Sequence, residues 1–279
     1  MSPLPGMRPE FTALDRHYRV DTNTRVPRID GSQWRLSAGG LIQRPLEWTL
    51  DDLRHYEATH QFVTLSCISN PAGGDLISTT RWTGISLKRL LPELILSDAA
   101  THLRIASADG FSESIAIETI RSDARIMLTY AWDGVLLPAE HGFPLRIYIP
   151  DLYGMKQPKW IVAMTAVDRW EPGYWVARGW DREGHVAIAS AIDVVSAGPM
   201  VELGGMAHTG SRGVSKVEVR MDDAEWRAAE LREPLSDTTW VLWRARLAVP
   251  PGDHVFTVRA FDGQGRPQNA GFHTKQRRT

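Results

Sequence analysis

The chain has 279 residues, and its 32 Lys and Arg residues nearly balance its 33 Asp and Glu residues, which leaves a formal net charge of −1. This balance gives no support to a nucleic-acid-binding protein or a polybasic membrane-surface protein. The single cysteine, Cys67, excludes an internal disulfide and a multi-cysteine zinc or iron–sulfur site. No apolar stretch reaches the ~18 residues of a membrane span, so we expect a soluble chain.

The first hundred residues predict short strands and short helices. Residues 34–38 alternate as a strand does, and Gly39-Gly40 is expected to end that strand. Thr49 is expected to cap a short helix, because a threonine hydroxyl can accept from a free backbone N–H of the first turn. Ser86 is expected to cap a second short helix over residues 87–91 in the same way.

Strands dominate from Leu103 onward. Residues 126–132, the turn pair Asp133-Gly134 and residues 135–137 predict a β-hairpin. Apolar residues then alternate with polar ones around Arg146, which places Arg146 on the face of its strand opposite the apolar one.

The last hundred residues predict a separate all-β domain. Alternating strands over 216–221, 240–249 and 254–261 are separated by turns at about ten-residue spacing, a pattern typical of a β-sandwich. We therefore expect a first domain over residues 1–183 and a second over 184–279.

Cys67 is the first candidate for chemistry. It lies at the end of a β-rich run, directly before a loop rich in Gly and Pro. A thiolate there could be a nucleophile or a ligand for a soft metal. The alternative is a small buried hydrophobe, and position alone favours that alternative because free cysteines are usually buried.

Two basic segments form the second candidate. Residues 141–146 contain His141 and Arg146, and residues 153–160 contain Lys156 and Lys159, all beside Gly and Pro. Such a set could hold the phosphate of a cofactor. It could equally be a pair of solvated loops with paired charges. A third candidate, the aromatic stretch over residues 170–180, could wall a substrate pocket or, more commonly, fill a domain junction.

Three segments together resemble the sulfite oxidase family of molybdopterin enzymes. Residues 64–70, with residues 81–85 after them, are similar to the family's metal-binding cysteine strand and its loop. Residues 141–146 and 153–160 are similar to its pterin-phosphate elements. The similarity runs from about Tyr18 into the last hundred residues.

The resemblance implies an α+β fold, in which a mixed α+β molybdopterin domain is followed by an immunoglobulin-like all-β domain of the dimerisation type. It implies one molybdopterin per molybdenum, with Cys67 as the protein ligand of the metal. The cofactor-binding residues that it implies are Asn23, Cys67, Ser69, Asn70, Arg81, Trp82, Thr83, His141, Arg146, Gly154, Met155, Lys156 and Lys159.

The resemblance also suggests the substrate class. Sulfite oxidases carry an Arg where the alignment places Asp21, and a Tyr where it places Trp180. Because Asp21 would repel sulfite, the expected reaction is oxygen-atom transfer on a small S- or N-oxide, with Cys67, Asp21, Asn23 and Trp180 at the catalytic site. The alternatives are sulfite oxidation and a non-catalytic two-domain binding module.

The partners implied are a small-molecule substrate and a separate electron donor or acceptor protein, with no nucleic acid. A homodimer through the C-terminal domain is a further expectation. The family resemblance also suggests the extracytoplasmic part of an exported or membrane-anchored parent, although no leader is visible near Met1.

Overall fold

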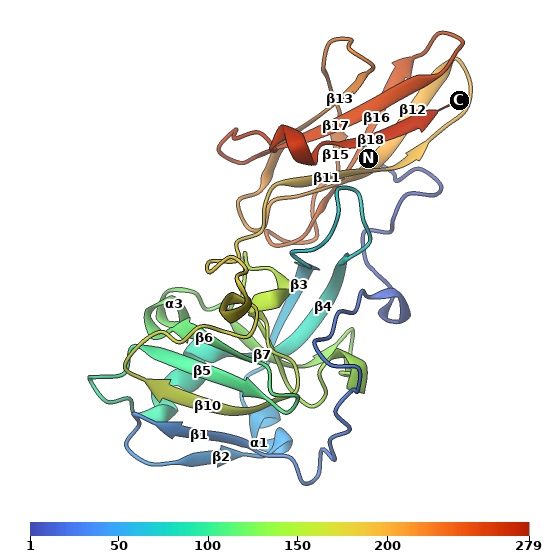
Figure 1. Cartoon of the computed structure of the whole chain (residues 1–279). Coiled ribbons are helices and arrows are strands. Elements are labelled where there is room, and N and C mark those ends of the chain that lie inside the picture. The colour runs from blue at the N-terminus through green and yellow to red at the C-terminus, as the bar shows by residue number, and fades with distance from the viewer. Residues whose placement is uncertain (279) are drawn as a thin grey trace. The chain divides into compact units, whose positions relative to one another are not determined.

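The computed structural model describes residues 1–278, and they are mostly β with few helices (Figure 1). Contacts divide the chain into two compact units. The mixed unit contains Arg19–Gln61 and Arg81–Gly184. The sandwich unit contains Met1–Tyr18, Phe62–Thr80 and the chain from His185 onward.

A five-stranded sheet organises the mixed unit. Its strand order is β2 (Leu46–Trp48), β1 (Leu36–Gly40), β10 (Ile161–Val167), β5 (His102–Ser107) and β6 (Ser112–Ala116). Strands β1 and β10 are parallel, and the other neighbours are antiparallel.

The predicted end of the first strand is confirmed, because β1 ends at Gly40. Both glycines still belong to the strand and pair with Thr165 and Ala166 of β10. Gly40 has φ +80°, and a Cβ there would lie 2.2 Å from the Ala166 carbonyl oxygen. A glycine is therefore what lets β10 approach this end of β1.

Three α-helices lie in the described part of the mixed unit: α1 (Leu50–His55), α2 (Leu87–Leu90) and α3 (Ile117–Ser122). The predicted Thr49 cap is confirmed, since the Asp52 N–H donates to Thr49 Oγ1 at 3.0 Å and the Thr49 N–H donates to the Asp52 carboxylate at 2.8 Å. The Ser86 cap was wrong. Its hydroxyl instead donates to the Ala124 carbonyl at 2.7 Å.

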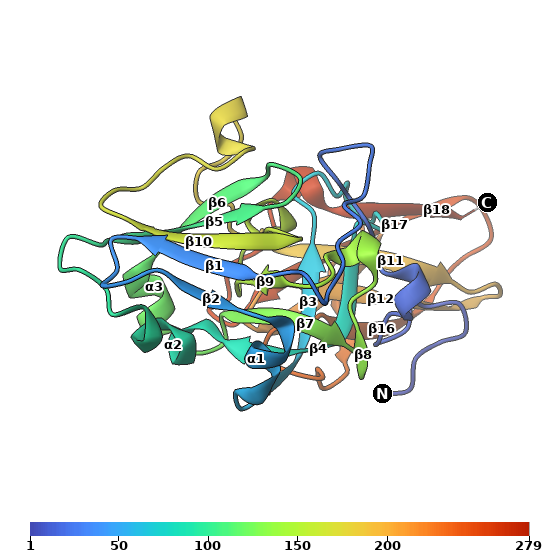
Figure 2. The same ribbon diagram turned by 90° about the horizontal axis from the view of Figure 1, so that it is seen from below.

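The core of the mixed unit lies between the five-stranded sheet and these helices. Leu36 and Leu103 from the sheet, Leu53 from α1, Leu90 from α2 and Ile120 from α3 belong to one buried cluster. Figure 2 shows α2 and α3 together on one side of the sheet. Burial of this apolar surface is the main stabilising contribution to the unit.

A second sheet contains the predicted hairpin. Its order is β3 (Thr59–Ser66), β4 (Ile77–Ser86), β7 (Met127–Trp132) and β8 (Val135–Leu136), and β9 (Arg146–Tyr148) also pairs with β7. The hairpin prediction is confirmed, because Trp132 pairs with Val135 across the Asp133-Gly134 turn. Both turn residues have positive φ, as a two-residue hairpin loop requires.

The sandwich unit has two four-stranded sheets. One has the order β11 (Ala189–Val195), β12 (Met200–His208), β16 (Val241–Ala248) and β15 (Glu230–Leu231). The other has the order β14 (Arg227–Ala228), β13 (Val214–Met221), β17 (His254–Asp262) and β18 (Thr274–Arg278). The three strands predicted here are confirmed by β13, β16 and β17.

Buried residues from both sheets, among them Leu203, Val219, Trp243 and Phe256, form one core of the sandwich unit. Its immunoglobulin-like type and the predicted boundary after residue 183 stay predictions. The 3₁₀-helices of the described chain are Leu14–Arg16, Leu91–Leu94, Ala139–His141, Gly154–Lys156, Val176–Arg178 and Ala270–Phe272.

Candidate functional site

The turn that leads into β9 brings His141 and Arg146 together. The 3₁₀-helix Ala139–His141 ends at His141, and Arg146 Nη1 donates to the His141 carbonyl at 3.1 Å. Arg146 lies opposite the apolar side chains of its strand, yet it is only 4% exposed. Its guanidinium carbon lies 4.5 Å from the ring centroid of Trp82, so an aromatic layer covers this face and holds the cation.

Gly142 brings Lys159 to the same turn. A Cβ on Gly142 would lie 3.1 Å from the Lys159 Cβ and 3.2 Å from the Arg146 Cβ. Gly142 also has φ +111°, which side chains other than glycine rarely adopt. The absence of a side chain at this position therefore lets two cationic residues converge.

Lys159 contacts the chain at three further points. Its Nζ donates to the Val20 carbonyl at 3.4 Å, to the Glu140 carbonyl at 3.2 Å and to the Asp21 carboxylate. Asp21 also accepts from Arg19 Nε at 2.6 Å. We call Arg19, Asp21, His141, Arg146 and Lys159 the cation cluster.

The cation cluster perturbs the acidity of its own members. The pKa of Lys159 is lowered to about 8, first by burial and then by the charges of Arg146 and Arg19, while Asp21 opposes these effects. The pKa of His141 is lowered to about 3, first by burial and also by the charges of Arg146, Lys159 and Arg19. His141 is therefore neutral near pH 7, and the cluster carries a surplus of positive charge.

The cation cluster fits the phosphate of the predicted cofactor. Guanidinium and ammonium groups are the usual phosphate partners, and the glycine turn leaves room beside them. Burial, and to a smaller extent the neighbouring cations, lower the pKa of Lys159, and an anion beside it would stabilise its protonated form. Sequence reasoning overlooked Arg19, and its position two residues before Asp21 was the only local signal.

The predicted catalytic residues Asp21, Asn23 and Trp180 have different neighbours. Asp21 belongs to the cation cluster. Asn23 Nδ2 donates to the Asp109 carbonyl at 2.8 Å. Trp180 is 39% exposed and packs edge-on against Trp175, with ring centroids 5.7 Å apart. Their shared role in a substrate pocket stays a prediction.

Lys156, predicted beside Lys159 on the phosphate, has a different partner. Its Nζ lies 2.7 Å from a carboxylate oxygen of Glu113, and both side chains are buried. Burial raises the pKa of Glu113, and the hydrogen bond and charge of Lys156 oppose that rise. Sequence reasoning missed Glu113, although a carboxylate two residues from both Phe111 and Ile115, and so on their apolar face of a strand, is a recognisable signal.

Three other predicted residues lie in the middle of β4. Trp82 is fully buried beneath Arg146. Thr83 Oγ1 is 2.8 Å from His60 Nδ1, and Arg81 is exposed. Gly154 and Met155 form the 3₁₀-turn that contains Lys156.

Cys67 begins a closed loop in the sandwich unit. The Cys67 N–H donates to the Leu76 carbonyl at 2.9 Å, and the Leu76 N–H donates to Asn70 Oδ1 at 2.9 Å. The Cys67 residue is 8% exposed, and its sulfur lies 3.0 Å from Ser69 Oγ. The loop therefore holds the predicted residues Cys67, Ser69 and Asn70 together.

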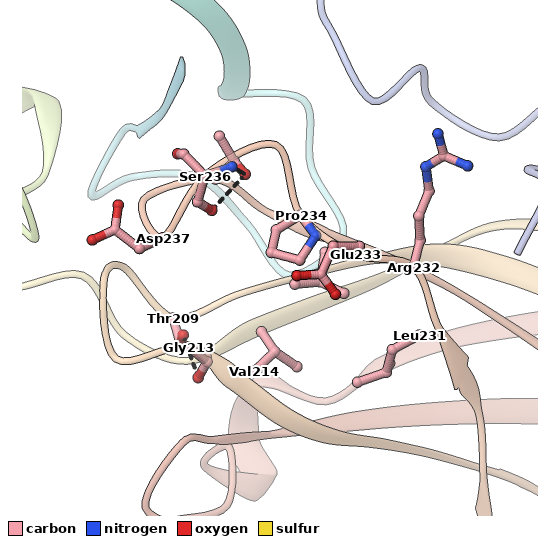
Figure 3. A pocket seen from close by; sticks show the side chains of 11 residues that line it. Thr209, Gly213, Val214, Leu231, Arg232, Glu233, Pro234, Ser236 and Asp237 are labelled. Carbon is pink, nitrogen blue, oxygen red and sulfur yellow. Dashed lines mark hydrogen bonds between the residues drawn. The ribbon is translucent and has the colours of Figure 1, made fainter. Parts of the chain in front are cut away.

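A pocket of about 320 Å³ in the sandwich unit contains none of the predicted site residues (Figure 3). Its lining consists of Thr209, Gly213, Val214, Leu231, Arg232, Glu233, Pro234, Ser236, Asp237, Thr239 and Val241. Within residues 1–278, no group of three or more His, Cys, Asp or Glu residues is arranged to hold a metal ion. Over the same residues, no helix has the length and apolar character needed to cross a membrane.

A mostly β fold with a cation-lined glycine turn and one thiol defines a protein suited to an anionic cofactor. A sequence-family model described as "Oxidoreductase molybdopterin binding domain" matches residues 23–175, which is more than half of the chain. The chain belongs to this family, among the oxidoreductases of the sulfite oxidase type. This confirms the predicted family and the molybdenum–molybdopterin cofactor.

Curated relatives cover several activities. NAD(P)H nitrate reductase of Hordeum vulgare is 24% identical over 93% of this chain and 37% of the relative. Mitochondrial sulfite oxidase of Mus musculus is 27% identical over 81% of this chain and 51% of the relative. A candidate protein-methionine-sulfoxide reductase subunit, YedZ1, of Azospira oryzae is 30% identical over 56% of this chain and 57% of the relative. The chain thus spans about a third to just over half of these relatives.

A solved structure supports the fold. The sulfane dehydrogenase SoxCD from Paracoccus pantotrophus has a TM-score of 0.80 and 19% identity, covering 92% of this chain and 74% of that chain. At this identity, the likeness shows that the two chains share a fold.

Proposed function

We propose that the chain is a molybdopterin-dependent oxidoreductase that transfers an oxygen atom to or from a small substrate, most simply by reducing an S- or N-oxide. For a sulfoxide, two electrons and two protons convert R₂SO to R₂S and water. The observation that carries this proposal is the cation cluster, because Arg146 and Lys159 converge at Gly142 inside the segment that matches the molybdopterin family.

The proposed role of the cation cluster is to bind and orient the cofactor phosphate. Arg146 is held over Trp82 and by the His141 carbonyl, so its guanidinium keeps one orientation. Lys159 supplies a point charge, and neutral His141 can supply one hydrogen bond from its ring. When bound, the cofactor supplies the two-electron redox chemistry.

The proposed role of Cys67 is that of the protein ligand to molybdenum. A thiolate is a soft ligand, and Cys67 is the only thiol that the sequence offers. The closed loop fixes the cysteine backbone at both of its polar groups, as a preorganised ligand requires. The remaining proposed cofactor contacts are Asn23, Ser69, Asn70, Arg81, Trp82, Thr83, Gly154 and Met155. Lys156, which the sequence predicted with them, pairs with Glu113 instead.

Metal analysis tests this proposal. The protein is purified from a host that makes molybdopterin, and its molybdenum content is measured beside that of C67A and C67S. We expect about one molybdenum per wild-type chain and a strong loss in both variants, because neither retains the sulfur. Wild-type protein without molybdenum, or variants with undiminished content and activity, would contradict the proposal.

Sulfite oxidation is the second candidate, and one observation favours it. Asp21 was expected to repel sulfite, but Arg19 and Lys159 both pair with its carboxylate and so offset its charge. Steady-state turnover of methionine sulfoxide and of sulfite, each with an artificial electron carrier, separates the two reactions. Faster sulfite turnover would select the second candidate.

A separate electron-transfer protein is the proposed redox partner, and a homodimer through the C-terminal region is a proposed assembly. Both can be measured on the loaded protein, the first by reduction with candidate redox proteins and the second by its mass in solution. A non-catalytic binding module would lack the visible absorption that a molybdenum dithiolene centre gives.

A further inference from the structure

A buried ion pair joins two elements of the mixed unit. Glu113 comes from β6 and Lys156 from the turn Gly154–Lys156, and their charged groups lie 2.7 Å apart. The two side chains are only 2% and 6% exposed. Such a pair needs a reason to be buried, because desolvating two charges offsets much of their attraction.

The chain that follows β10 packs against this ion pair at two points, one on each side chain. A Cβ on Gly173 would lie 2.2 Å from Glu113 Oε2, and a Cβ on Gly184 would lie 2.7 Å from Lys156 Cγ. Both glycines are buried, whereas most residues between them are exposed. The backbone at each end of this stretch therefore rests directly on one member of the pair.

Backbone hydrogen bonds hold the same two ends. The Tyr174 N–H donates to the Ser112 carbonyl, beside Glu113, at 3.0 Å. The Tyr153 N–H, in the turn that contains Lys156, donates to the Gly184 carbonyl at 2.8 Å. We call residues 174–183 the strap. It carries Trp175 and Trp180, which pack on one another.

We propose that Glu113 and Lys156 are positioning residues whose ion pair anchors both ends of the strap, and that Lys156 has this role instead of contacting the cofactor. The anchoring stands on the contacts of the mixed unit alone. Its functional consequence rests on the proposed function, because the predicted substrate residue Trp180 lies on the strap. Lys159 and Arg146 are then left as the cationic phosphate contacts of the two basic segments.

The physical prediction is a cycle of charge changes. Removing one charge leaves the other buried without its partner, which loosens the segments that enclose it. Replacing both residues by Met keeps similar volume and leaves no charge, so packing over the glycines is retained. E113Q and K156M should therefore each make the strap more accessible to a protease. E113M/K156M should restore the accessibility of the wild-type chain.

Limited trypsin digestion with mass spectrometry measures this opening at single sites. Arg178 and Arg182 lie within the strap, while Arg54 and Arg169 are exposed control sites elsewhere in the mixed unit. In E113Q and K156M, cleavage after Arg178 and Arg182 should rise by about tenfold or more, with the control sites unchanged. In E113M/K156M, cleavage after Arg178 and Arg182 should fall back toward the wild-type rate.

An equal rise at the control sites would overturn the inference, because it would show general destabilisation. A double variant as open as E113Q would also overturn it. K156M, which also removes one charge of the pair, gives the same comparison with the double variant if E113Q does not accumulate.

Molybdenum content separates the inference from the proposed function. If Lys156 only positions the strap, E113M/K156M should hold nearly as much molybdenum as wild type, and K159M should hold far less. A double variant as poor in molybdenum as K159M would make Lys156 a cofactor contact and overturn that part. Wild-type protein without molybdenum would contradict the proposed function. The digestion result would then test the anchoring of the strap by itself.

Discussion

Lys159 lies where burial and two guanidinium groups oppose its positive charge. Its pKa of about 8 means that its charge changes within the range of ordinary buffers. The Asp21 carboxylate offsets part of this effect, so an arriving anion and Asp21 would share the same ammonium group. Protonation of one side chain should therefore control anion binding at this site.

Sulfate affinity tests the charge of Lys159, because sulfate keeps its charge between pH 6 and pH 10. Deprotonation of Lys159 above pH 8 should weaken binding to the cofactor-free chain by up to about tenfold per pH unit. K159R should bind with a flatter pH profile, since an arginine stays charged. An unchanged profile in K159R would show that another group titrates.

His141 predicts a dependence of folding stability on acid. Its pKa is lowered from 6.5 to about 3 in the folded chain, so its contribution is complete above pH 6.5 and is lost as the pH falls toward 3. Denaturant unfolding of the cofactor-free chain should show wild-type stability falling more steeply than that of H141Q across this window. The slopes of unfolding free energy against pH should differ between wild type and H141Q by at most one proton, which is about 1.4 kcal/mol per pH unit. Parallel curves would contradict it.

The missing side chain of Gly142 lets β9 and the segment before β10 approach one another. G142A should lower stability and sulfate affinity together, since the methyl group would press on Arg146 and Lys159. G110A is the matched control, because Gly110 has φ +87° and a Cβ there meets nothing within 4 Å. Both variants carry backbone strain, but only G142A should lose sulfate binding.

Helix α1 depends on its capping box. T49A should lower the free energy of unfolding by about 1 kcal/mol, because it leaves the Asp52 N–H without its acceptor. T24A, at an exposed loop position, should change stability by less than about 0.5 kcal/mol. Denaturant unfolding of both variants tests this, and equal effects would refute the assignment to the cap.

Local patterns predicted the elements whose causes are local. The Asp133-Gly134 turn and the Thr49 cap depend on residues within a few positions, and both are confirmed. The end of β1 at Gly40 is likewise confirmed. The pairing of Gly39 and Gly40 with β10 could not be predicted, because that partner lies far along the chain. Ser86 failed as a cap for the same reason, since the distant Ala124 carbonyl accepts from its hydroxyl.

In the candidate site, too, contacts between sequence neighbours could be predicted and contacts between distant residues could not. His141, Gly142 and Arg146 are neighbours in sequence, so their association could be predicted. The pairing of Lys156 with Glu113 could not, because it depends on how β6 lies against a later turn. Basic residues in one short segment can thus have different partners in the folded chain.

The chain passes between the two units more than once. Residues 62–80 belong to the sandwich unit, although residues on either side of them belong to the mixed unit. The Thr64 N–H donates to the Thr238 carbonyl at 3.1 Å, and the Trp240 N–H donates to Thr64 Oγ1 at 2.8 Å. This stretch therefore depends on partners near the C-terminal end.

Truncation after residue 183 should accordingly not leave an intact domain. It would remove the partners of Thr64 and expose Ile77, which packs with Ala191 and Trp240. We expect a truncated chain with a lower melting temperature, weaker unfolding cooperativity and stronger binding of a hydrophobic dye than the full chain. A truncated chain as stable as the full one would support the boundary predicted from sequence.

The single cysteine also allows metal occupancy to be measured by chemical labelling of the chain. Because there is one sulfhydryl in 279 residues, an alkylating reagent can add only one cysteine-bound mass increment to each molecule. If that sulfur is engaged by a metal, the tagged and untagged fractions in an intact-mass spectrum become a direct gauge of occupancy, readable without any turnover assay.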